Sequence, residues 1–342
     1  MAQSGDKKDK NNMRTSLRIL FGAIIAVLLF FVLGKINFPE VYKIFRSINI
    51  KFFLLAFASY SLAIIIFSLR SMISLRKIIL KHDFWFFLKT ALAGSFINVI
   101  TPGSNVGGEP IRAYFLGEKY NKPKTQIFGA VLADRILHGA ASLFFTVASL
   151  LFILTYIPVS EELEIIFQTA LFFIIAFLAI VFLLNMKKTR FNLSNLLKKI
   201  RVLVPIKKSS KIHHIGQTFG NFTRSFKRTI FNKKTLFFGL LFSFAFWILN
   251  YLSSYFLFLS LDVKISFFLV ITVVSLVTFA ENFSPIPGGI GLSEGFMIFF
   301  YSVIGVEPSA AIIVTLLSRM IIYFYSLVLG GINLFYLEKS LG

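Results

Sequence analysis

The sequence predicts an all-α integral membrane protein with about six full transmembrane helices and two re-entrant helical hairpins, arranged as an inverted-topology repeat. Three observations lead to this fold class. The composition is very apolar, basic residues gather between apolar segments, and a short Pro-Gly motif followed by Glu occurs twice.

The composition excludes a soluble protein of this size. Hydrophobic residues make up 56% of the 342 positions and include 44 Phe. No β-barrel alternation is present, so the spans are expected to be helices, which satisfy their own backbone groups in lipid. The chain has no Cys, which excludes disulfides and thiol chemistry. Its net charge of +21 comes from loop residues, so no nucleic-acid partner is expected.

The positions of the charged residues predict a multi-pass protein of the cell (cytoplasmic) membrane, with both termini on the cytoplasmic side. Residues 1–16 are polar, and we expect a disordered cytoplasmic tail there. The N-terminal membrane half covers 17–184 and contains the first repeat, 52–156; the C-terminal membrane repeat covers 236–338. The expected full spans are 17–34, 52–69, 126–156, 165–184, 236–260 and 309–336.

Loop charges support this orientation. A cytoplasmic loop is predicted directly after residue 69, because Arg70, Arg76, Lys77 and Lys81 follow there. Residues 187–234 hold 14 Lys or Arg and no Asp or Glu, which indicates a basic cytoplasmic linker. Its amphipathic patterns, at 193–204 and 212–230, predict either helices lying on an anionic leaflet or a plain charged connection.

The repeated motif interrupts two apolar segments. One copy runs from Asn98 to Glu109 and the other from Asn282 to Glu294, and in each copy five residues separate Pro-Gly from Glu. The apolar residues that follow the first break, 109–117, are too few to span the bilayer. We therefore expect each copy to form a hairpin that enters the membrane and returns. The alternative is two ordinary short helices at each copy, giving more crossings.

Ionisable residues accompany both copies. Arg135 follows Glu109 by 26 positions, and Arg319 follows Glu294 by 25. A charge at the centre of a membrane helix costs about 2.5–3.5 kcal/mol or more, so function is the first hypothesis. Helix N-termini at the breaks are suited to anions such as phosphate. The alternatives are structural Glu–Arg pairs and simple helix kinks. The glycines expected to allow non-helical backbone conformations at the breaks are Gly103, Gly107, Gly108, Gly288 and Gly289.

Neighbouring polar residues extend the candidate site. Arg112 lies one turn after Glu109 and is expected to reach a phosphate or to extend to the cytoplasmic interface. Asp134, beside Arg135, is a candidate second carboxylate partner in the Glu–Arg pairs. Asn98 and Asn282 are candidate helix caps or ligand-binding groups. The sequence contains no phosphate-binding loop of the kind that binds nucleotides, no nucleophile elbow and no cluster of metal-ligand residues. We therefore expect no enzyme activity, no cofactor and no metal site.

The motifs resemble those of the flippase-like transmembrane family, which includes the N-terminal membrane region of lysylphosphatidylglycerol synthetases. The resemblance lies in residues 101–114, Asp134-Arg135, and residues 285–294 with Arg319. In the synthetases this region moves aminoacylated phosphatidylglycerol between leaflets. The resemblance implies that the lipid path is lined by Glu109, Arg112, Arg135, Glu294 and Arg319.

The resemblance covers residues 15–338, roughly the whole chain. The synthetases continue into a large cytosolic aminoacyl-transfer domain, whereas this sequence stops at Gly342, so we expect it not to make lysyl-lipid. The leading hypothesis is translocation of an anionic or zwitterionic phospholipid, with the phosphate at Arg135 or Arg319. Glu109 and Glu294 would bind a cationic group or carry a coupling proton.

Three other functions fit the same residues. One is a transporter or channel for a small soluble anion, and another is an intramembrane transferase acting on lipid-linked substrates. The last is a membrane partner whose basic linker, 187–234, docks a separately encoded lipid-modifying enzyme. The expected partners are membrane lipids, an anionic leaflet at that linker, and either a second copy of the chain or such an enzyme.

Overall fold

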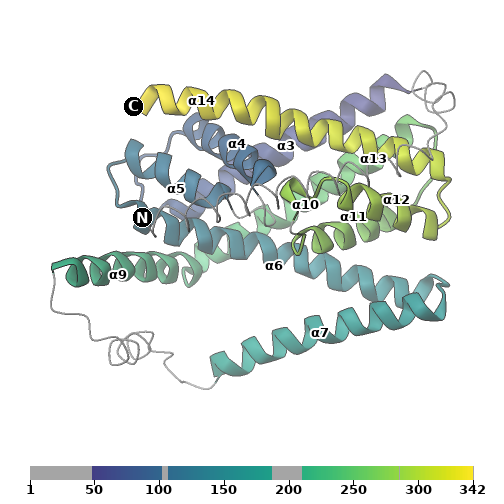
Figure 1. Ribbon diagram of the computed structural model, residues 1–342, viewed down its shortest axis with the longest axis horizontal. Coiled ribbons are helices and arrows are strands. Elements are labelled where there is room, and N and C mark those ends of the chain that lie inside the picture. The colour runs from purple at the N-terminus through teal and green to yellow at the C-terminus, as the bar shows by residue number, and fades with distance from the viewer. Residues whose placement is uncertain (1–47, 102–106, 187–209, 285, 342) are drawn as a thin grey trace, which may run out of the picture.

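The computed structural model describes residues 48–101, 107–186, 210–284 and 286–341, and all regular secondary structure in these ranges is helical (Figure 1). The predicted tail, the first predicted span at 17–34, the amphipathic stretch at 193–204 and Gly103 lie outside these ranges. The all-helical prediction is confirmed for the described part.

Four helical segments in the described ranges are long and apolar enough to cross a membrane. They are α3 (Ile50–Leu75), α6 (Lys124–Tyr156), α10 (Lys233–Ser260) and the continuous segment formed by α13 (Pro308–Tyr323), η2 (Phe324–Leu329) and α14 (Gly330–Leu341). Each contains one of the predicted spans. The span predicted at 165–184 lies within α7 (Glu161–Met186), a helix of 26 residues. The chain is therefore a multi-pass integral membrane protein.

Shorter helices lie between the long ones, in the same order in both halves. In the first half they are α4 (Phe84–Ile100) and α5 (Gly108–Lys119). In the second half they are α11 (Phe267–Glu281), the single turn η1 (Pro287–Gly289) and α12 (Leu292–Val303). Within each pair the two helices pack on each other. The expected helix–break–helix units are present, while their return within the membrane and the inverted orientation of the halves remain predictions.

Polar caps and glycines explain where the short helices begin and end. The Asp83 side chain accepts the backbone N–H of Phe86 at 3.2 Å and starts α4. The second break turns through Gly288, Gly289 and Gly291, whose φ angles are +61°, +65° and +86°. Side chains with a Cβ rarely adopt this left-handed conformation, so glycine is needed for the turn into α12.

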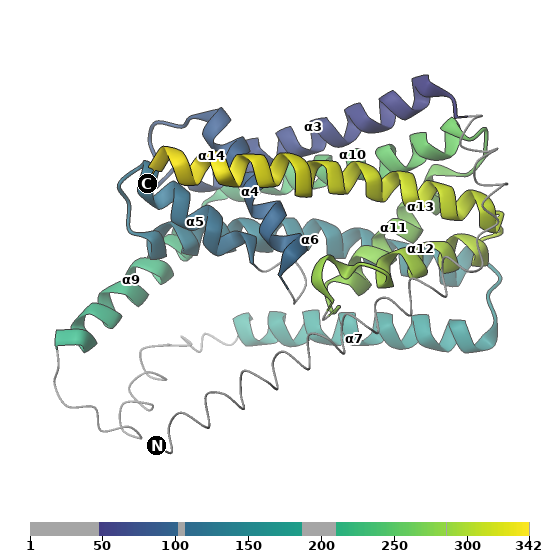
Figure 2. The same cartoon turned by 45° about the horizontal axis from the view of Figure 1, so that its top comes forward.

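The two halves interlock. Helix α3 of the first half packs along α10 of the second, α6 packs on α11, and α4 packs on η2 and α14. In both views α14 crosses α4 (Figures 1 and 2). A Cβ at Gly330 would lie 2.6 Å from the Leu92 carbonyl oxygen, so glycine permits this close crossing. Residues of both halves therefore line the centre of the helix bundle.

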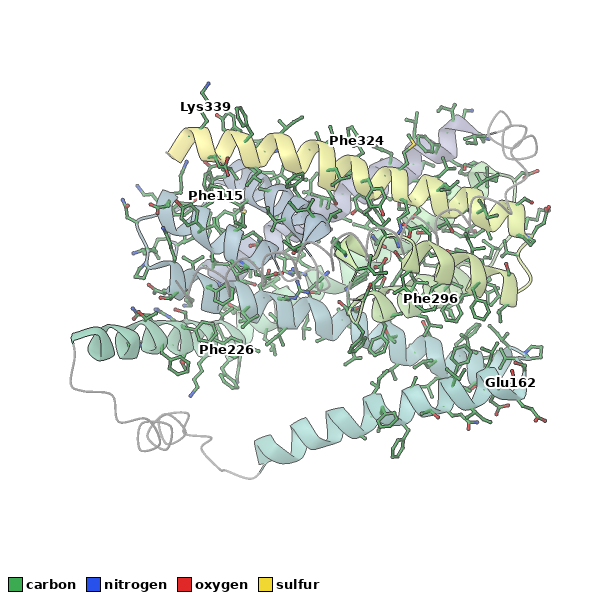
Figure 3. The ribbon with its side chains drawn as sticks, in the orientation of Figure 1. Phe115, Glu162, Phe226, Phe296, Phe324 and Lys339 are labelled. Carbon is green, nitrogen blue, oxygen red and sulfur yellow. The ribbon has the colours of Figure 1, made fainter. Side chains whose placement is uncertain are left out.

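The described part of the basic linker is the amphipathic helix α9 (Ser210–Ile230), which packs on α6. Figure 3 labels Phe226 on this helix. Thr229 is buried and donates to the Ser74 carbonyl at 3.3 Å, whereas Arg224, Lys227 and Arg228 are exposed. One face of α9 therefore contacts protein and the other is basic and accessible. Contact with an anionic leaflet remains a prediction.

The prediction that Arg70 belongs to a loop is wrong. Helix α3 continues to Leu75, and Arg70 is 1% exposed inside it. Its guanidinium pairs with the Asp134 carboxylate. This ion pair offsets the cost of burying the charge of Arg70 away from water. The apolar run before Arg70 marks only part of α3.

Candidate functional site

A cavity of about 260 Å³ lies where the two halves meet. Its charged lining side chains are Glu109 and Arg112 of α5, Glu281 of α11 and Arg319 of α13. The breaks approach each other at its wall, because a Cβ at Gly288 would lie 3.1 Å from the Val99 carbonyl oxygen at the end of α4. Other polar lining residues include Ser95, Asn98, His138, Asn250 and Tyr323.

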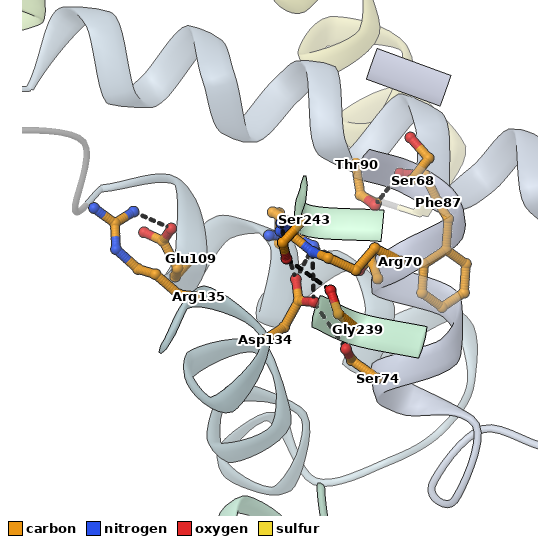
Figure 4. A network of polar contacts seen from close by, with 12 residues as sticks. Ser68, Arg70, Ser74, Phe87, Thr90, Glu109, Asp134, Arg135, Gly239 and Ser243 are labelled. Atoms are coloured by element: carbon orange, nitrogen blue, oxygen red, sulfur yellow. Dashed lines mark hydrogen bonds and ion pairs between the residues drawn. The ribbon is translucent and has the colours of Figure 1, made fainter. Parts of the chain in front are cut away.

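The first motif copy forms the expected Glu–Arg pair. Arg135 Nη1 donates to Glu109 Oε1, as Figure 4 shows. Glu109 is 6% exposed in the first turn of α5, where the helix dipole favours a carboxylate. Its other oxygen, Oε2, is buried without a hydrogen-bond partner among the described residues. Glu109 thus keeps one acceptor unused at the cavity wall.

Asp134 forms a separate buried network with α3. Arg70 Nε and Nη2 donate to its two carboxylate oxygens at 2.9 and 3.2 Å, and Ser74 Oγ donates to Oδ1 at 2.8 Å (Figure 4). Arg70 Nη1 also contacts Ser243 Oγ of α10 at 3.3 Å. Asp134, a candidate second partner for Arg135, therefore holds Arg70 of α3 instead, and Arg70 in turn contacts the second half through Ser243.

The sequence left open whether Arg112 reaches a phosphate or extends to the cytoplasmic interface, and the second alternative is wrong. It is 4% exposed, and its Nη2 donates to Ser71 Oγ at 2.5 Å. Nη2 also lies 3.7 Å from Asp134 Oδ2, and the guanidinium carbon lies 4.8 Å from the Phe67 ring centroid. Nε has no hydrogen-bond partner among the described residues. Asp134 and the packing of the stem hold Arg112 inside, with one buried donor unused.

The second motif copy places one arginine between two carboxylates. Arg319 Nη2 donates to Glu281 Oε1, and Arg319 Nε lies 3.1 Å from Glu294 Oε1. Glu294 also accepts the Gly291 N–H at 2.6 Å at the start of α12 and the Tyr323 hydroxyl at 3.1 Å. The expected Glu294–Arg319 pair is present. Glu281 was missed by the sequence reading, although a carboxylate within the apolar stretch 265–283 was a usable signal.

The two asparagines that precede the breaks have different roles. Asn98 Oδ1 accepts the Gly108 N–H at 2.7 Å, so the end of α4 caps the start of α5. Asn282 instead donates through Nδ2 to the Thr278 carbonyl at 2.9 Å and is exposed. A Cβ at Gly108 would lie 2.4 Å from the Gly94 carbonyl oxygen. Asn98 and Gly108 together bring α5 close against α4.

Of the predicted site residues, the cavity wall contains Asn98, Glu109, Arg112, Gly288 and Arg319. Arg135 and Glu294 do not line the cavity but pair with the lining residues Glu109 and Arg319. His138 lies on the wall stacked on Trp247, with ring centroids 4.9 Å apart. In the described ranges, no group of three or more His, Cys, Asp or Glu is placed to hold a metal ion.

The groups around the cavity differ in charge between the halves. On the first side three arginines, Arg70, Arg112 and Arg135, accompany Glu109 and Asp134, which leaves one positive charge in excess. On the second side Arg319 accompanies Glu281 and Glu294, which leaves one negative charge in excess. The lining itself has one carboxylate and one arginine from each half, and the excess charge lies in the two supporting clusters as far as the described contacts show. We call the first cluster the positive side of the cavity and the second the negative side.

Comparison with protein families matches residues 18–330 to the family described as lysylphosphatidylglycerol synthase TM region. The chain belongs to this family. The matched range contains both motif copies and all four charged residues that line the cavity.

Curated relatives in archaea cover almost the same length. A UPF0104 membrane protein of Pyrococcus horikoshii is 30% identical over 326 residues, which are 94% of this chain and 96% of that protein. A UPF0104 membrane protein of Methanocaldococcus jannaschii is 29% identical over 318 residues, covering 91% of this chain and 92% of that protein. One from Methanothermobacter thermautotrophicus is 24% identical over 332 residues, covering 95% and 96%. These names identify membrane proteins and state no substrate.

Proposed function

We propose that this protein translocates a phospholipid across the cell membrane by passing the headgroup through the cavity between its two halves. The observation that supports this most directly is the charged lining: Glu109 and Arg112 come from one half and Glu281 and Arg319 from the other. Ionisable groups at membrane depth are costly and mark substrate paths. Family membership supports a role in the membrane, and the lipid substrate is our proposal.

In this mechanism the headgroup phosphate binds at Arg112. Its Nε is a buried donor without a hydrogen bond. Arg319 Nε also lacks a hydrogen bond, but it lies 3.1 Å from Glu294, and Arg319 is paired with two carboxylates, so its charge is already compensated. This assignment replaces the expectation that Arg135 or Arg319 binds the phosphate. A cationic part of the headgroup binds at the negative side, near Glu281. Paired charges lower the cost of several kcal/mol for an unpaired headgroup at membrane depth.

Movement of one half against the other exposes the cavity alternately to the two leaflets. The equal order of long and short helices in the two halves supports this, because rocking of inverted repeats around a central site is a general transporter mechanism. The proposal includes two re-entrant hairpins, with both chain termini on the cytoplasmic side. The site is assigned transport and no bond-making step.

The proposal is tested with purified protein in liposomes. A headgroup-labelled phospholipid is added, and a membrane-impermeant quencher reports the label in each leaflet. We expect fast exchange between leaflets that is strongly slowed in Arg112→Gln and unchanged in Lys122→Gln, which alters an exposed lysine outside the cavity.

A parallel arm measures the flux of a small soluble anion, inorganic phosphate, through the same liposomes. Flux of phosphate without lipid exchange, with and without a proton gradient, would replace the lipid with a soluble anion as substrate. Exchange of lipid that is equally fast in Arg112→Gln would move the path away from the cavity.

A further inference from the structure

A second hollow, of about 250 Å³, lies at one end of the bundle and shares no lining residue with the central cavity. It is formed by the start of α4, the end of α5 and the end of α14, which lie together at the same end in Figures 1 and 2. Its lining residues are Asp83, Trp85, Phe86, Lys89, Lys119, Tyr336 and Ser340.

Lys89 brings an uncompensated positive charge to this hollow. It lies in the second turn of the apolar helix α4, and its ammonium is 3.9 Å from the centroid of the Tyr336 ring. Among the described residues no carboxylate lies within 4.0 Å of it. A cation on an aromatic face keeps its other donors free for an anion.

Lys119 faces the same hollow from α5. Its ammonium lies 4.7 Å from the Phe86 ring centroid and 3.5 Å from Asp83 Oδ2. That ion pair is loose and partly exposed, so it contributes little and is readily exchanged for another anion. The two lysines and Asp83 leave one positive charge in excess.

The rim of the hollow has the character of a membrane interface. Trp85 is 68% exposed and Tyr336 is 54% exposed, and such aromatic residues gather at the level of lipid headgroups. Along α14, next to Tyr336, Phe335 and Ile332 are 70% and 60% exposed. A headgroup in the hollow would therefore have its acyl chains beside an apolar surface of α14.

We propose that this hollow binds the phosphate group of an anionic phospholipid from the surrounding leaflet, held between Lys89 and Lys119. The lipid bridges α4 and α14, which cross closely at Gly330. The exposed apolar face of α14 favours a lipid over a soluble phosphate ester. This site is separate from the transport cavity and does not depend on what the cavity carries.

Trp85 reports occupancy in the full-length protein in bilayers. It is one of two Trp in the chain, and Trp247 is buried, so Trp85→Phe identifies the signal from the hollow. We expect phosphatidylglycerol with brominated acyl chains to quench Trp85 at lower mole fraction than brominated phosphatidylcholine does. A lysine near a membrane surface contributes about 1 kcal/mol to binding an anionic lipid, so Lys89→Gln and Lys119→Gln should each reduce this preference about fivefold.

The matched control is Lys122→Gln, which removes an exposed lysine from the same end of the bundle and should leave the preference unchanged. Equal quenching of the wild-type protein by the two lipids would overturn the proposal, and this comparison needs no variant to fold. An unchanged preference in the folded double variant would also overturn it. Release of the quenching by soluble glycerophosphate would replace the lipid with a soluble phosphate ester.

Discussion

Around the first copy of the motif, Glu109 and Asp134 face three arginines, two of which come from α5 and α6 and one from α3. Around the second copy, Arg319 alone faces Glu281 and Glu294. Each copy has one Glu and one Arg at nearly equal spacing in the sequence. The environments nevertheless carry opposite excess charge.

The difference comes from residues outside the repeated motif. In the first cluster Arg70 and Asp134 compensate each other, so the excess positive charge comes from Arg112 of α5. In the second cluster the excess negative charge comes from Glu281 at the end of α11. The motif sets the backbone frame of each break, while these neighbours set the charge on each side of the cavity. A headgroup that carries both charges would bind across such a site with the phosphate toward α5.

The largest effect should follow Arg70→Ala, because it leaves Asp134 buried without its main partner. Breaking one partner of a buried ion pair costs about 3–5 kcal/mol of the free energy of unfolding. Denaturant unfolding in detergent measures this. The double variant Arg70→Met with Asp134→Leu should recover most of the loss, since no lone charge remains. A loss below about 1 kcal/mol in Arg70→Ala would show that this pair is not a main stabilising contact between α3 and α6.

Next in size is Arg319→Ala, which leaves Glu281 and Glu294 facing each other without a cation. We expect lipid exchange in liposomes to fall at least about tenfold, the factor that corresponds to 1.4 kcal/mol. Arg319→Lys should retain part of the activity, because an ammonium restores the charge but not the two-sided geometry. Wild-type exchange in Arg319→Ala would show that the negative side is not on the path.

A comparison of two arginines sharpens the assignment of the positive side. Arg112 lines the cavity, whereas Arg135 is not a lining residue and pairs with Glu109, with its side chain 30% exposed. A hydrogen bond to a charged group contributes about 1.5–3 kcal/mol, so Arg112→Gln should slow lipid exchange about tenfold or more. Arg135→Gln should slow it less. The opposite order in initial exchange rates would place the phosphate at Arg135.

The smallest expected difference is between the two asparagines. Asn98→Ala removes the side chain that caps α5 and should cost about 1 kcal/mol of the free energy of unfolding. Asn282→Ala removes an exposed side chain and should change stability by no more than about 0.5 kcal/mol. Unfolding midpoints measured side by side check this. Equal losses would mean that both asparagines act alike, as their positions in the motif suggest.

Much of the fold follows from local sequence signals. The apolar residues 84–100 before the first break coincide with α4 (Phe84–Ile100), because Asp83 caps its start and the sequence Thr-Pro-Gly, which disfavours a helix, follows it. The break before α12 was readable from its glycines, since only they tolerate its φ angles. These features depend on residues a few positions apart.

The charge pattern depends on contacts between distant residues and was only half readable. A basic residue after an apolar run predicts the end of a span, yet Arg70 stays inside α3 because of a partner 64 positions away, which no local pattern indicates. Glu281 was overlooked inside an apolar run, and its partner lies 38 positions away. Glu109–Arg135 and Glu294–Arg319 were found because the repetition itself gave their spacing.

The most direct measurement of whether headgroups pass through the shared cavity uses the absence of cysteine from the chain. Ser95→Cys places one thiol on the cavity wall, and Ser302→Cys places one at an exposed position on α12 outside it. Both proteins are reconstituted, labelled with a charged thiol reagent, checked by mass, and tested for lipid exchange. We predict normal exchange before labelling and loss of exchange only in labelled Ser95→Cys. Unchanged exchange after complete labelling at position 95 would contradict a headgroup path through this cavity.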